Sequence, residues 1–208
     1  VEEKGSIESL SVRGVVSVSD TKDTTTGGIV GINHGTLINC QFTGVVTGDS
    51  EVGGIVGRNE SEGTIDHSTA RAIVTGKSST GGLAGYNLGA ITGCTNVGSI
   101  NTEYQEASLD TDGFTAKMVD QINNKMAAAD DDATNSVTNV ATDTGGIAGR
   151  SSGMILTSVN TGTVGYEHVG YNVGGIVGRT DGLVSGCVNQ GHVLGRKDVG
   201  GIAGQAEP

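Results

Sequence analysis

The chain has 208 residues, with 37 glycines, one proline and no tryptophan, and its formal net charge is −11. Collagen is excluded, because it needs a strict three-residue glycine period and much proline. The acidic balance argues against a nucleic-acid partner, since phosphate binding needs a clustered basic surface. No run of 18 apolar residues occurs, so we predict no membrane insertion.

The first residues resemble the later part of a repeat that recurs further along the chain. GSIESLSVRGVVSV (5–18) matches GTLINCQFTGVVTG (35–48). Residues 1–26 are therefore predicted to form an N-terminal partial coil.

Glycine pairs then recur through the rest of the chain. Six segments with the pattern Gly-Gly-Ile/Leu-Val/Ala-Gly begin at Gly27, Gly53, Gly81, Gly145, Gly174 and Gly200. Spacings of this size are typical of repeat architectures, and the one long spacing indicates an insertion. We predict a single domain over 1–208, with coils at 27–100, an insertion at 101–144, and coils at 145–208 that end in a partial coil.

Each repeat predicts three short strands separated by turns. In the first full repeat these are GGIVG (27–31), TLINC (36–40) and GVV (44–46). One unit cannot bury its apolar side chains alone, so the units must stack with parallel strands about 4.8 Å apart. The predicted fold is all-β, a parallel β-solenoid of about six coils with one inserted α-helix. Within GGIVG, strand alternation would place Ile and Val on opposite faces.

The three cysteines support this stacking. The fifth residue after each turn glycine is Cys40, Ser68, Cys94, Ser158 and Cys187 in turn. Cysteines two coils apart are about 9–10 Å apart, which is beyond the reach of a disulfide. We expect them to be buried small residues.

The insertion carries a helical pattern. Phe114, Met118, Ile122 and Met126 recur every four residues, which predicts one apolar face of a helix. This face either docks on the solenoid or binds a partner. Asp110 and Asp112 cap the helix or, with Asp120, form a weak calcium site, although Val119 stands where a calcium loop needs Glu. No other cofactor is predicted.

Motifs for catalysis are weak. Gly149-Arg150-Ser151-Ser152-Gly153 fits the nucleophile-elbow pattern, but Asn33, Asn59, Asn87 and Thr180 occupy the place of Ser151 in other repeats. Glu51, Asp66, Asp181 and Asp198 fall at unrelated offsets, and His34, His67, His168 and His192 lie in different columns. We therefore expect neither a zinc site nor an enzyme.

The two ends of the chain are complementary parts of one repeat. GGIAG (200–204) is the first third of a unit, and residues 5–18 are the remainder. Either the sequence is a slice of a longer solenoid, or copies stack head to tail into a filament. The residues expected at such a junction are Ile7, Leu10, Val12, Val15, Ile202 and Ala203.

The repeat resembles the GLUG motif family. The resemblance rests on GGIVGINHGTLINCQFTGVVTG (27–48), GGIVGRNESEGTIDHSTARAIVTG (53–76), GGLAGYNLGAITGCTNVGSI (81–100), GGIAGRSSGMILTSVNTGTVG (145–165) and GGIVGRTDGLVSGCVNQGHVLG (174–195). This family occurs in bacterial surface proteins, including large adhesins and the non-catalytic regions of IgA-cleaving metallopeptidases.

The resemblance implies a secreted or cell-surface location in a bacterium. It also implies a non-enzymatic structural or adhesive module whose partners are further coils, other copies of itself, or a host glycan or protein. The alternatives are a carbohydrate-binding or carbohydrate-cleaving solenoid and the non-catalytic flank of a large surface protease.

Overall fold

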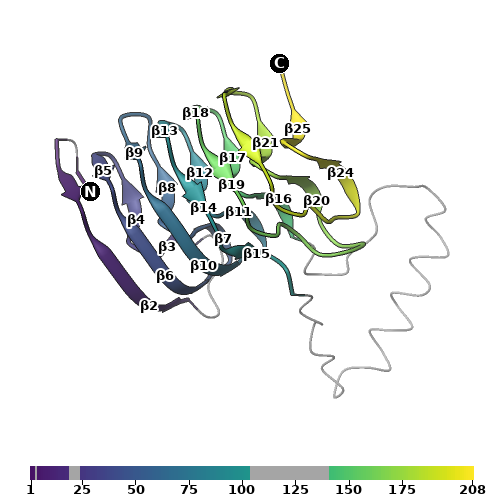
Figure 1. Ribbon diagram of the computed structural model, residues 1–208, viewed down its shortest axis with the longest axis horizontal. Helices are drawn as coiled ribbons and strands as arrows, with labels where there is room; N and C mark the ends of the chain where they lie inside the picture. The colour runs from purple at the N-terminus through teal and green to yellow at the C-terminus, as the bar shows by residue number, and fades with distance from the viewer. Residues whose placement is uncertain (3, 19–23, 104–140) are drawn as a thin grey trace, which may run out of the picture. The chain divides into compact units, whose positions relative to one another are not determined.

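A computed structural model of the chain describes residues 1–2, 4–18, 24–103 and 141–208, which form one compact unit. Four parallel sheets run along this unit, and each coil of the chain adds one strand to every sheet (Figure 1). The predicted parallel β-solenoid of about six coils is confirmed. The expected inserted helix and its residues, Asp110, Asp112, Phe114, Met118, Asp120, Ile122 and Met126, lie outside the described residues.

The four sheets are called A, B, C and D. Within each coil the chain passes through sheet C, then D, then A, then B. Sheet A contains β1 (Ser6–Glu8), β5 (Thr36–Ile38), β9 (Thr64–Asp66), β13 (Ala90–Thr92), β18 (Met154–Leu156) and β22 (Leu183–Ser185). Sheet B contains β2 (Ser11–Ser17), β6 (Gln41–Thr47), β10 (Thr69–Thr75), β14 (Thr95–Asn96), β19 (Val159–Asn160) and β23 (Val188–Asn189), with β15 (Ser99–Ile100) also paired to β10.

The other two sheets contain the glycine pairs. Sheet C contains β3 (Thr26–Gly27), β7 (Ser50–Gly53), β11 (Ser78–Gly81), β16 (Thr142–Gly145), β20 (Tyr171–Gly174) and β24 (Lys197–Gly200). Sheet D contains β4 (Val30–Asn33), β8 (Val56–Asn59), β12 (Ala84–Asn87), β17 (Ala148–Ser151), β21 (Val177–Thr180) and β25 (Ala203–Ala206). Each coil thus has four strands, and the prediction of three was wrong because the strand that ends at the first glycine was not recognised.

The glycine pair marks a bend between two strands. β7 ends at Gly53, the chain bends at Gly54–Ile55, and β8 begins at Val56. Ile55 and Val56 are both fully buried. Ile55 belongs to the bend and only Val56 lies in β8, so strand alternation does not apply to this pair.

Each glycine of the GGIVG motif lies against another backbone. A Cβ on Gly53 would meet the Val56 carbonyl oxygen, and one on Gly54 would meet the Gly82 carbonyl oxygen of the next coil. A Cβ on Gly57 would lie 2.7 Å from the Thr26 nitrogen of the preceding coil. The motif therefore allows sheets C and D and successive coils to approach more closely than any side chain permits.

The core is built mainly from small aliphatic side chains. Leu37, Ile65, Ile91 and Ile155 form one fully buried column, and Phe42 is the largest buried residue among those described. Burial of such columns in every coil is the main stabilising contribution to the stack, at about 25 cal/mol per Å² of apolar area.

The strand register continues without a break across the insertion. β10 pairs with β15 before it, and β11 pairs with β16 after it. Val74 aligns with Ile100 and Ser78 with Thr142, so residues 102–141 stand where the preceding coil has only Gly76 and Lys77.

Candidate functional site

Variation in loop length is concentrated at one corner of the solenoid. The corner between sheets B and C consists of short links at 48–49, 76–77 and 195–196. At the same corner in other coils, 18–23, 102–141 and 166–170 are longer. The B–C corner is therefore the place in the repeat where the number of residues between two strands varies most.

The described loop at 166–170 shows how the corner projects side chains. Tyr166 and Val169 form an isolated antiparallel bridge, which makes a small hairpin beyond the sheet. Tyr166 is 41% exposed, and His168 has a left-handed backbone with φ of 59°. The Arg196 guanidinium lies 5.8 Å from the centre of the Tyr171 ring. Aromatic and basic side chains thus gather beside the corner in this part of the stack.

Behind that corner, Asn101 fixes the point where the insertion leaves the solenoid. Its Oδ1 accepts a hydrogen bond from the Gly76 nitrogen at 2.9 Å, and its Nδ2 donates to Thr144 Oγ1 at 3.0 Å. One side chain therefore connects the coils on both sides of the inserted segment. This contact holds the core closed whatever the insertion displays.

A ladder of asparagines runs through sheet D. Asn33 Nδ2 donates to Asn59 Oδ1 at 2.8 Å, and Asn59 Nδ2 donates to Asn87 Oδ1 at 2.9 Å. Asn87 Nδ2 then donates to Ser151 Oγ at 3.0 Å. All four side chains are fully buried. Ser151, the serine of the nucleophile-elbow pattern, is therefore the acceptor that ends this ladder.

A second asparagine ladder runs through sheet B in the later coils. Asn96 Nδ2 donates to Asn160 Oδ1 at 2.8 Å, and Asn160 Nδ2 donates to Asn189 Oδ1 at 2.9 Å. The same column holds Val12, Phe42 and Ala70 in the earlier coils. Both ladders point their donors toward the C-terminal end of the stack.

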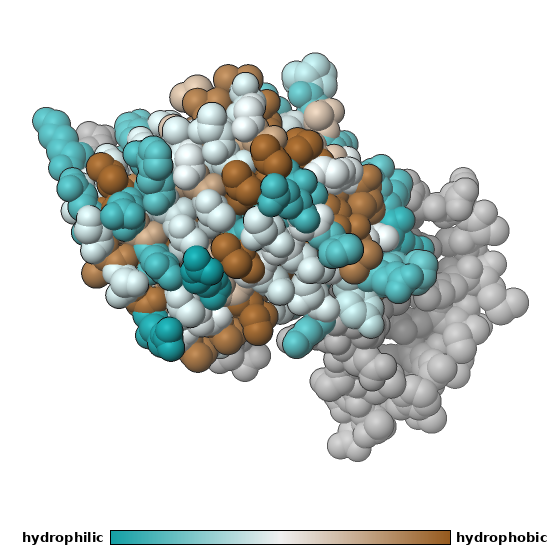
Figure 2. All heavy atoms as spheres, in the orientation of Figure 1, coloured by the Kyte–Doolittle hydropathy of each residue, from teal (hydrophilic) through white to brown (hydrophobic). Residues whose placement is uncertain are grey.

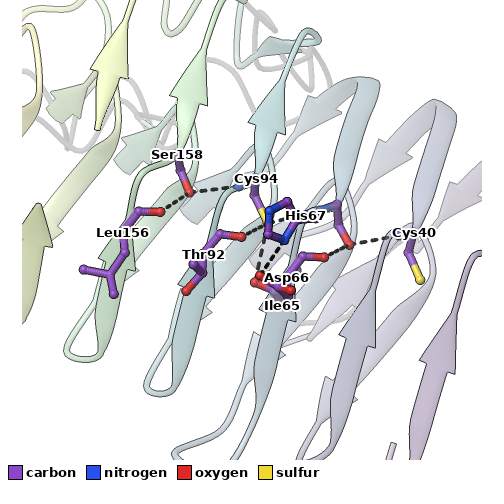
Figure 3. A network of polar contacts seen from close by, with 9 residues as sticks. Cys40, Ile65, Asp66, His67, Thr92, Cys94, Leu156 and Ser158 are labelled. Atoms are coloured by element: carbon purple, nitrogen blue, oxygen red, sulfur yellow. Dashed lines mark hydrogen bonds and ion pairs between the residues drawn. The ribbon is translucent and has the colours of Figure 1, made fainter. Parts of the chain in front are cut away.

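The predicted column of cysteines and serines is confirmed. Cys40, Cys94 and Ser158 lie in one row, each between the sheet A and sheet B strands of its coil (Figure 3). The hydrogen bonds of Ser68 place it between the two cysteines. The backbone nitrogen of Cys40 donates to Ser68 Oγ at 3.1 Å, and that of Ser68 donates to Cys94 Sγ at 3.4 Å. The Cys94 nitrogen donates in turn to Ser158 Oγ at 3.2 Å.

The thiols in this column have environments that suit a structural role. Burial raises the pKa of Cys94 to about 12, and it raises that of the half-buried Cys187. A thiol that stays protonated is a poor nucleophile and a poor metal ligand. Three free cysteines, Cys40, Cys94 and Cys187, are present among the described residues.

The outer face of sheet D carries a basic and aromatic column. Arg58 and Arg150 lie 5.2 and 5.4 Å from the centre of the Tyr86 ring. Arg58 also pairs with Glu51 at 2.9 Å and with Glu60 at 2.8 Å. The Tyr86 ring is therefore already engaged by two cations, and the Arg58 charge is compensated.

The carboxylates of sheet C are arranged more regularly than we predicted from the sequence. Glu51, Asp143 and Asp198 occupy one column, with Ser79 and Asn172 between them. The expectation that Glu51 and Asp198 fall at unrelated offsets was wrong, because each stands two residues before the glycine pair of its coil, in the strand that the sequence analysis did not recognise. Asp66 and Asp181 lie elsewhere, on sheet A and in the turn after β21.

The described histidines do not converge. His34 follows β4, His67 lies beside Asp66 with its Nδ1 2.9 Å from Oδ1, His168 is on the B–C corner, and His192 follows β23. Across residues 1–2, 4–18, 24–103 and 141–208, no group of three His, Cys, Asp or Glu side chains could hold a metal ion.

The residues expected at a head-to-tail junction all lie in the terminal half-coils. Ile7, Val12 and Ala203 are partly buried against the core, whereas Leu10, Val15 and Ile202 are exposed. Leu183, Val188 and Val199 add further exposed apolar surface at the C-terminal end. On the face seen in Figure 2, apolar side chains are otherwise interspersed with polar ones. The structure contains a single copy, so it does not bring the two ends together.

These features define a class of protein, the parallel β-solenoid built from sequence repeats. A family model described as the GLUG motif matches residues 48–75, which comprise one complete coil from the B–C corner to the end of β10. The predicted resemblance is confirmed for this coil, and the chain carries a GLUG motif. No curated protein and no solved structure gives a match. No helix in the described residues is long and apolar enough to cross a membrane.

Proposed function

We propose that this chain is a non-enzymatic structural and adhesive module at a bacterial surface. The observation that carries the proposal is the unbroken register of all four sheets across a large insertion. A stack of this kind holds its edges at fixed spacing while one corner accepts segments of very different length. The GLUG motif at residues 48–75 supports the surface setting.

In this proposal the solenoid is a rigid spacer and the B–C corner is its display edge. The insertion is its largest displayed segment, and its sequence pattern predicts a helix with Phe114, Met118, Ile122 and Met126 on one face. That face either docks on the solenoid or contacts a host protein or glycan. Further coils of the same kind, or a second copy of this chain, extend the spacer.

Carbohydrate binding is a second candidate function, and one observation favours it. The column Glu51, Asp143 and Asp198 lies on the same edge of the coils as the B–C corner and runs along the stack. A single row of carboxylates can accept hydrogen bonds from sugar hydroxyls along an extended glycan. Two of these carboxylates already have partners, because Glu51 pairs with Arg58 and Asp143 accepts from Asn172 Nδ2 at 2.7 Å.

The test uses the whole chain and one matched variant. The chain is immobilised and screened against host and bacterial oligosaccharides and extracellular proteins, with product analysis for turnover. In the variant, Gly-Lys replaces residues 102–141, as at Gly76-Lys77. We expect binding without turnover, loss of binding in the variant, and an unchanged β-type circular dichroism spectrum.

Two outcomes would contradict the proposal. Cleavage of a glycan that disappears in Glu51→Gln or Asp198→Asn would make the chain an enzyme. Binding that survives in the insertion variant but is lost in those carboxylate variants would favour the carbohydrate-binding candidate.

A further inference from the structure

The outer column of sheet D contains three arginines, and one of them lacks the carboxylate partner that the other two have. Arg58, Arg150 and Arg179 occupy equivalent places in their coils. Arg58 pairs with two glutamates, and Arg179 Nη2 donates to both carboxylate oxygens of Glu207 at 2.6 and 2.7 Å. Among the described residues, no carboxylate forms an ion pair with Arg150.

The places that supply partners to Arg58 hold different residues in the coil of Arg150. The two glutamates that pair with Arg58 stand seven residues before it and two residues after it. At the same offsets from Arg150 stand Asp143 and Ser152. Asp143 is buried, is one methylene group shorter than Glu, and accepts a hydrogen bond from Asn172 at 2.7 Å. Ser152 carries no charge, so neither residue compensates the Arg150 guanidinium.

The place that supplies the partner of Arg179 also holds a shorter side chain for Arg150. Glu207 stands two residues after the sheet D residue that aligns with Arg179, and the equivalent residue for Arg150 is Asp181. A hydrogen bond from Ser152 and, to a smaller extent, the nearby Arg150 charge lower the pKa of the Asp181 carboxyl. Arg150 and Asp181 are therefore close enough to interact electrostatically, yet they form no ion pair.

Tyr86 connects these two charged groups. The Arg150 guanidinium lies over the Tyr86 ring, 5.4 Å from its centre, and the Tyr86 hydroxyl lies 3.2 Å from Ser152 Oγ. Because the Ser152 hydroxyl donates to Asp181, the Tyr86 hydroxyl is the donor in its contact with Ser152. A guanidinium held over a ring still donates hydrogen bonds in its own plane. The edge donors of Arg150 thus remain available to a ligand.

The chemistry of this cluster selects one kind of ligand. A carboxylate suits Arg150, because guanidinium donors match carboxylate oxygens, and the Glu207 carboxylate binds the equivalent Arg179 in this way. Asp181 repels a second anionic group but accepts hydrogen bonds from hydroxyl groups. Both requirements are met by a molecule that carries a single carboxylate beside several hydroxyls.

We propose that Arg150 and Asp181 form a binding site for an acidic sugar of the uronic acid type. Arg150 binds the sugar carboxylate, and Asp181 accepts hydrogen bonds from the sugar hydroxyls. Tyr86 and Ser152 hold these two side chains in place. The site rests on the carbohydrate-binding candidate of the proposed function and narrows it to one sugar class, but it does not use the carboxylate column of sheet C.

The test is an NMR titration of the whole chain with methyl glucuronide, followed at the Arg150 side-chain N–H and at the Ser152 and Asp181 amides. Methyl glucoside lacks the carboxylate and acetate lacks the hydroxyls, so these two compounds are matched control ligands. We expect a Kd on the order of 1 mM for the glucuronide, as a few hydrogen bonds at a partly exposed site provide. Each control ligand should bind roughly tenfold more weakly or worse.

Two variants block the site in different ways. Arg150→Gln removes the cation, and Ser152→Glu adds a carboxylate at the place from which Glu60 pairs with Arg58. Each should weaken glucuronide binding roughly tenfold or more, with an unchanged β-type circular dichroism spectrum. Arg71→Gln, on the exposed face of sheet B, is the control and should leave binding unchanged.

Asp181→Ala separates the two halves of the site, because it should reduce the affinity for the glucuronide to that for acetate. Equal binding of glucuronide and acetate by the unaltered chain would overturn the sugar assignment. Absence of saturable shifts, or equal binding by Arg150→Gln, would overturn the site itself. The insertion and the carboxylate column stay unaltered in all these variants, so either result would leave the spacer and display role of the proposed function standing.

Discussion

Asn59 accepts a hydrogen bond from Asn33 on one side and donates one to Asn87 on the other, at 2.8 and 2.9 Å. The three side chains are fully buried, so these hydrogen bonds replace those that water would supply. The relationship is directional, because each amide nitrogen faces the C-terminal end. A change in one asparagine therefore has different consequences for the residues before and after it.

This direction predicts a difference between two small substitutions at one site. Asn87→Ala removes the Oδ1 acceptor of Asn59 Nδ2, which keeps its 3.1 Å hydrogen bond to the Gly63 carbonyl oxygen, whereas Asn87→Ser offers a hydroxyl, as Ser151 does one coil later. Both remove similar volume, so the difference isolates the acceptor. We expect Ala to destabilise the fold by about 1–3 kcal/mol more than Ser, measured by urea unfolding. Equal stabilities would mean that the ladder direction has no energetic consequence.

Two threonines of sheet C should respond in opposite ways to the same substitution. Thr80 Oγ1 is buried and has no hydrogen-bond partner among the described residues, and its column contains Val52 and Val173. We expect Thr80→Val to raise stability by about 1 kcal/mol, because it removes a buried hydroxyl without a partner.

The matched change is Thr144→Val in the same column. It removes the acceptor of Asn101 Nδ2 and should lower stability by about 1–3 kcal/mol. Thermal denaturation of both variants measures the two effects. A loss of stability in Thr80→Val would show that its hydroxyl has a partner that the described residues do not reveal.

The second glycine of the repeat should tolerate alanine only at the end of the stack. In Gly54→Ala the new methyl group would meet the Gly82 carbonyl oxygen, whereas in Gly201→Ala it meets nothing within 4 Å. Gly54→Ala should therefore destabilise the chain by several kcal/mol, an effect on the order of that found for overpacked cores. Gly201→Ala should be nearly neutral. Equal losses of stability at the two positions would contradict this difference.

Alkaline pH should weaken the fold through Cys94. Burial raises the pKa of this thiol from 9.0 to about 12, so the unfolded chain releases the thiol proton at a lower pH than the folded chain does. Stability should therefore be unaffected by this group below pH 9 and fall by about 1.4 kcal/mol per pH unit above it. Cys94→Ser removes the effect and suits a column that already contains Ser68 and Ser158.

The measurement is urea unfolding of the wild-type chain and Cys94→Ser at pH 8 and pH 10.5. The variant should lose less stability between the two values. Cys187→Ser is the control, because Cys187 is only half-buried and should contribute less. Identical losses in all three proteins would contradict the assignment of the alkaline effect to Cys94.

The repeat was easy to predict and its bends were not. Glycine spacing and the Cys/Ser column predicted a parallel stack because both recur at one position per coil. The bend at Gly54–Ile55 could not be predicted, since two consecutive apolar residues fit either a strand or a corner until the neighbouring coils are in place. The strand Ser50–Gly53 was missed for a related reason. Its one fully buried side chain is Val52, and the equivalent positions in the next two coils are Thr80 and Thr144, so no apolar residue recurs there.

The ladders left a signal that could have been found. Asn-x-Gly recurs at 96–98, 160–162 and 189–191, and Asn33, Asn59 and Asn87 share one place in the repeat. Asn96, Asn160 and Asn189 each stand seven residues after the turn glycine, so their common column could have been read across the insertion as the Cys/Ser column was. Glu51 and Asp198 likewise each stand two residues before a glycine pair, so their common column could also have been read from the sequence. The helix expected in the insertion and the calcium ligands Asp110, Asp112 and Asp120 remain predictions.

The hydrogen bonds of Asn101 with Gly76 and Thr144 make the packing of the coils independent of the sequence of the inserted segment. In most folds these two requirements must be met together. Packing is completed on the inner side of the corner, before the chain departs and after it returns. Natural variation or an engineer can therefore exchange the departing segment for another without redesigning the coils beneath it. Such an exchange changes the segment that the solenoid carries while the number and packing of its coils stay the same.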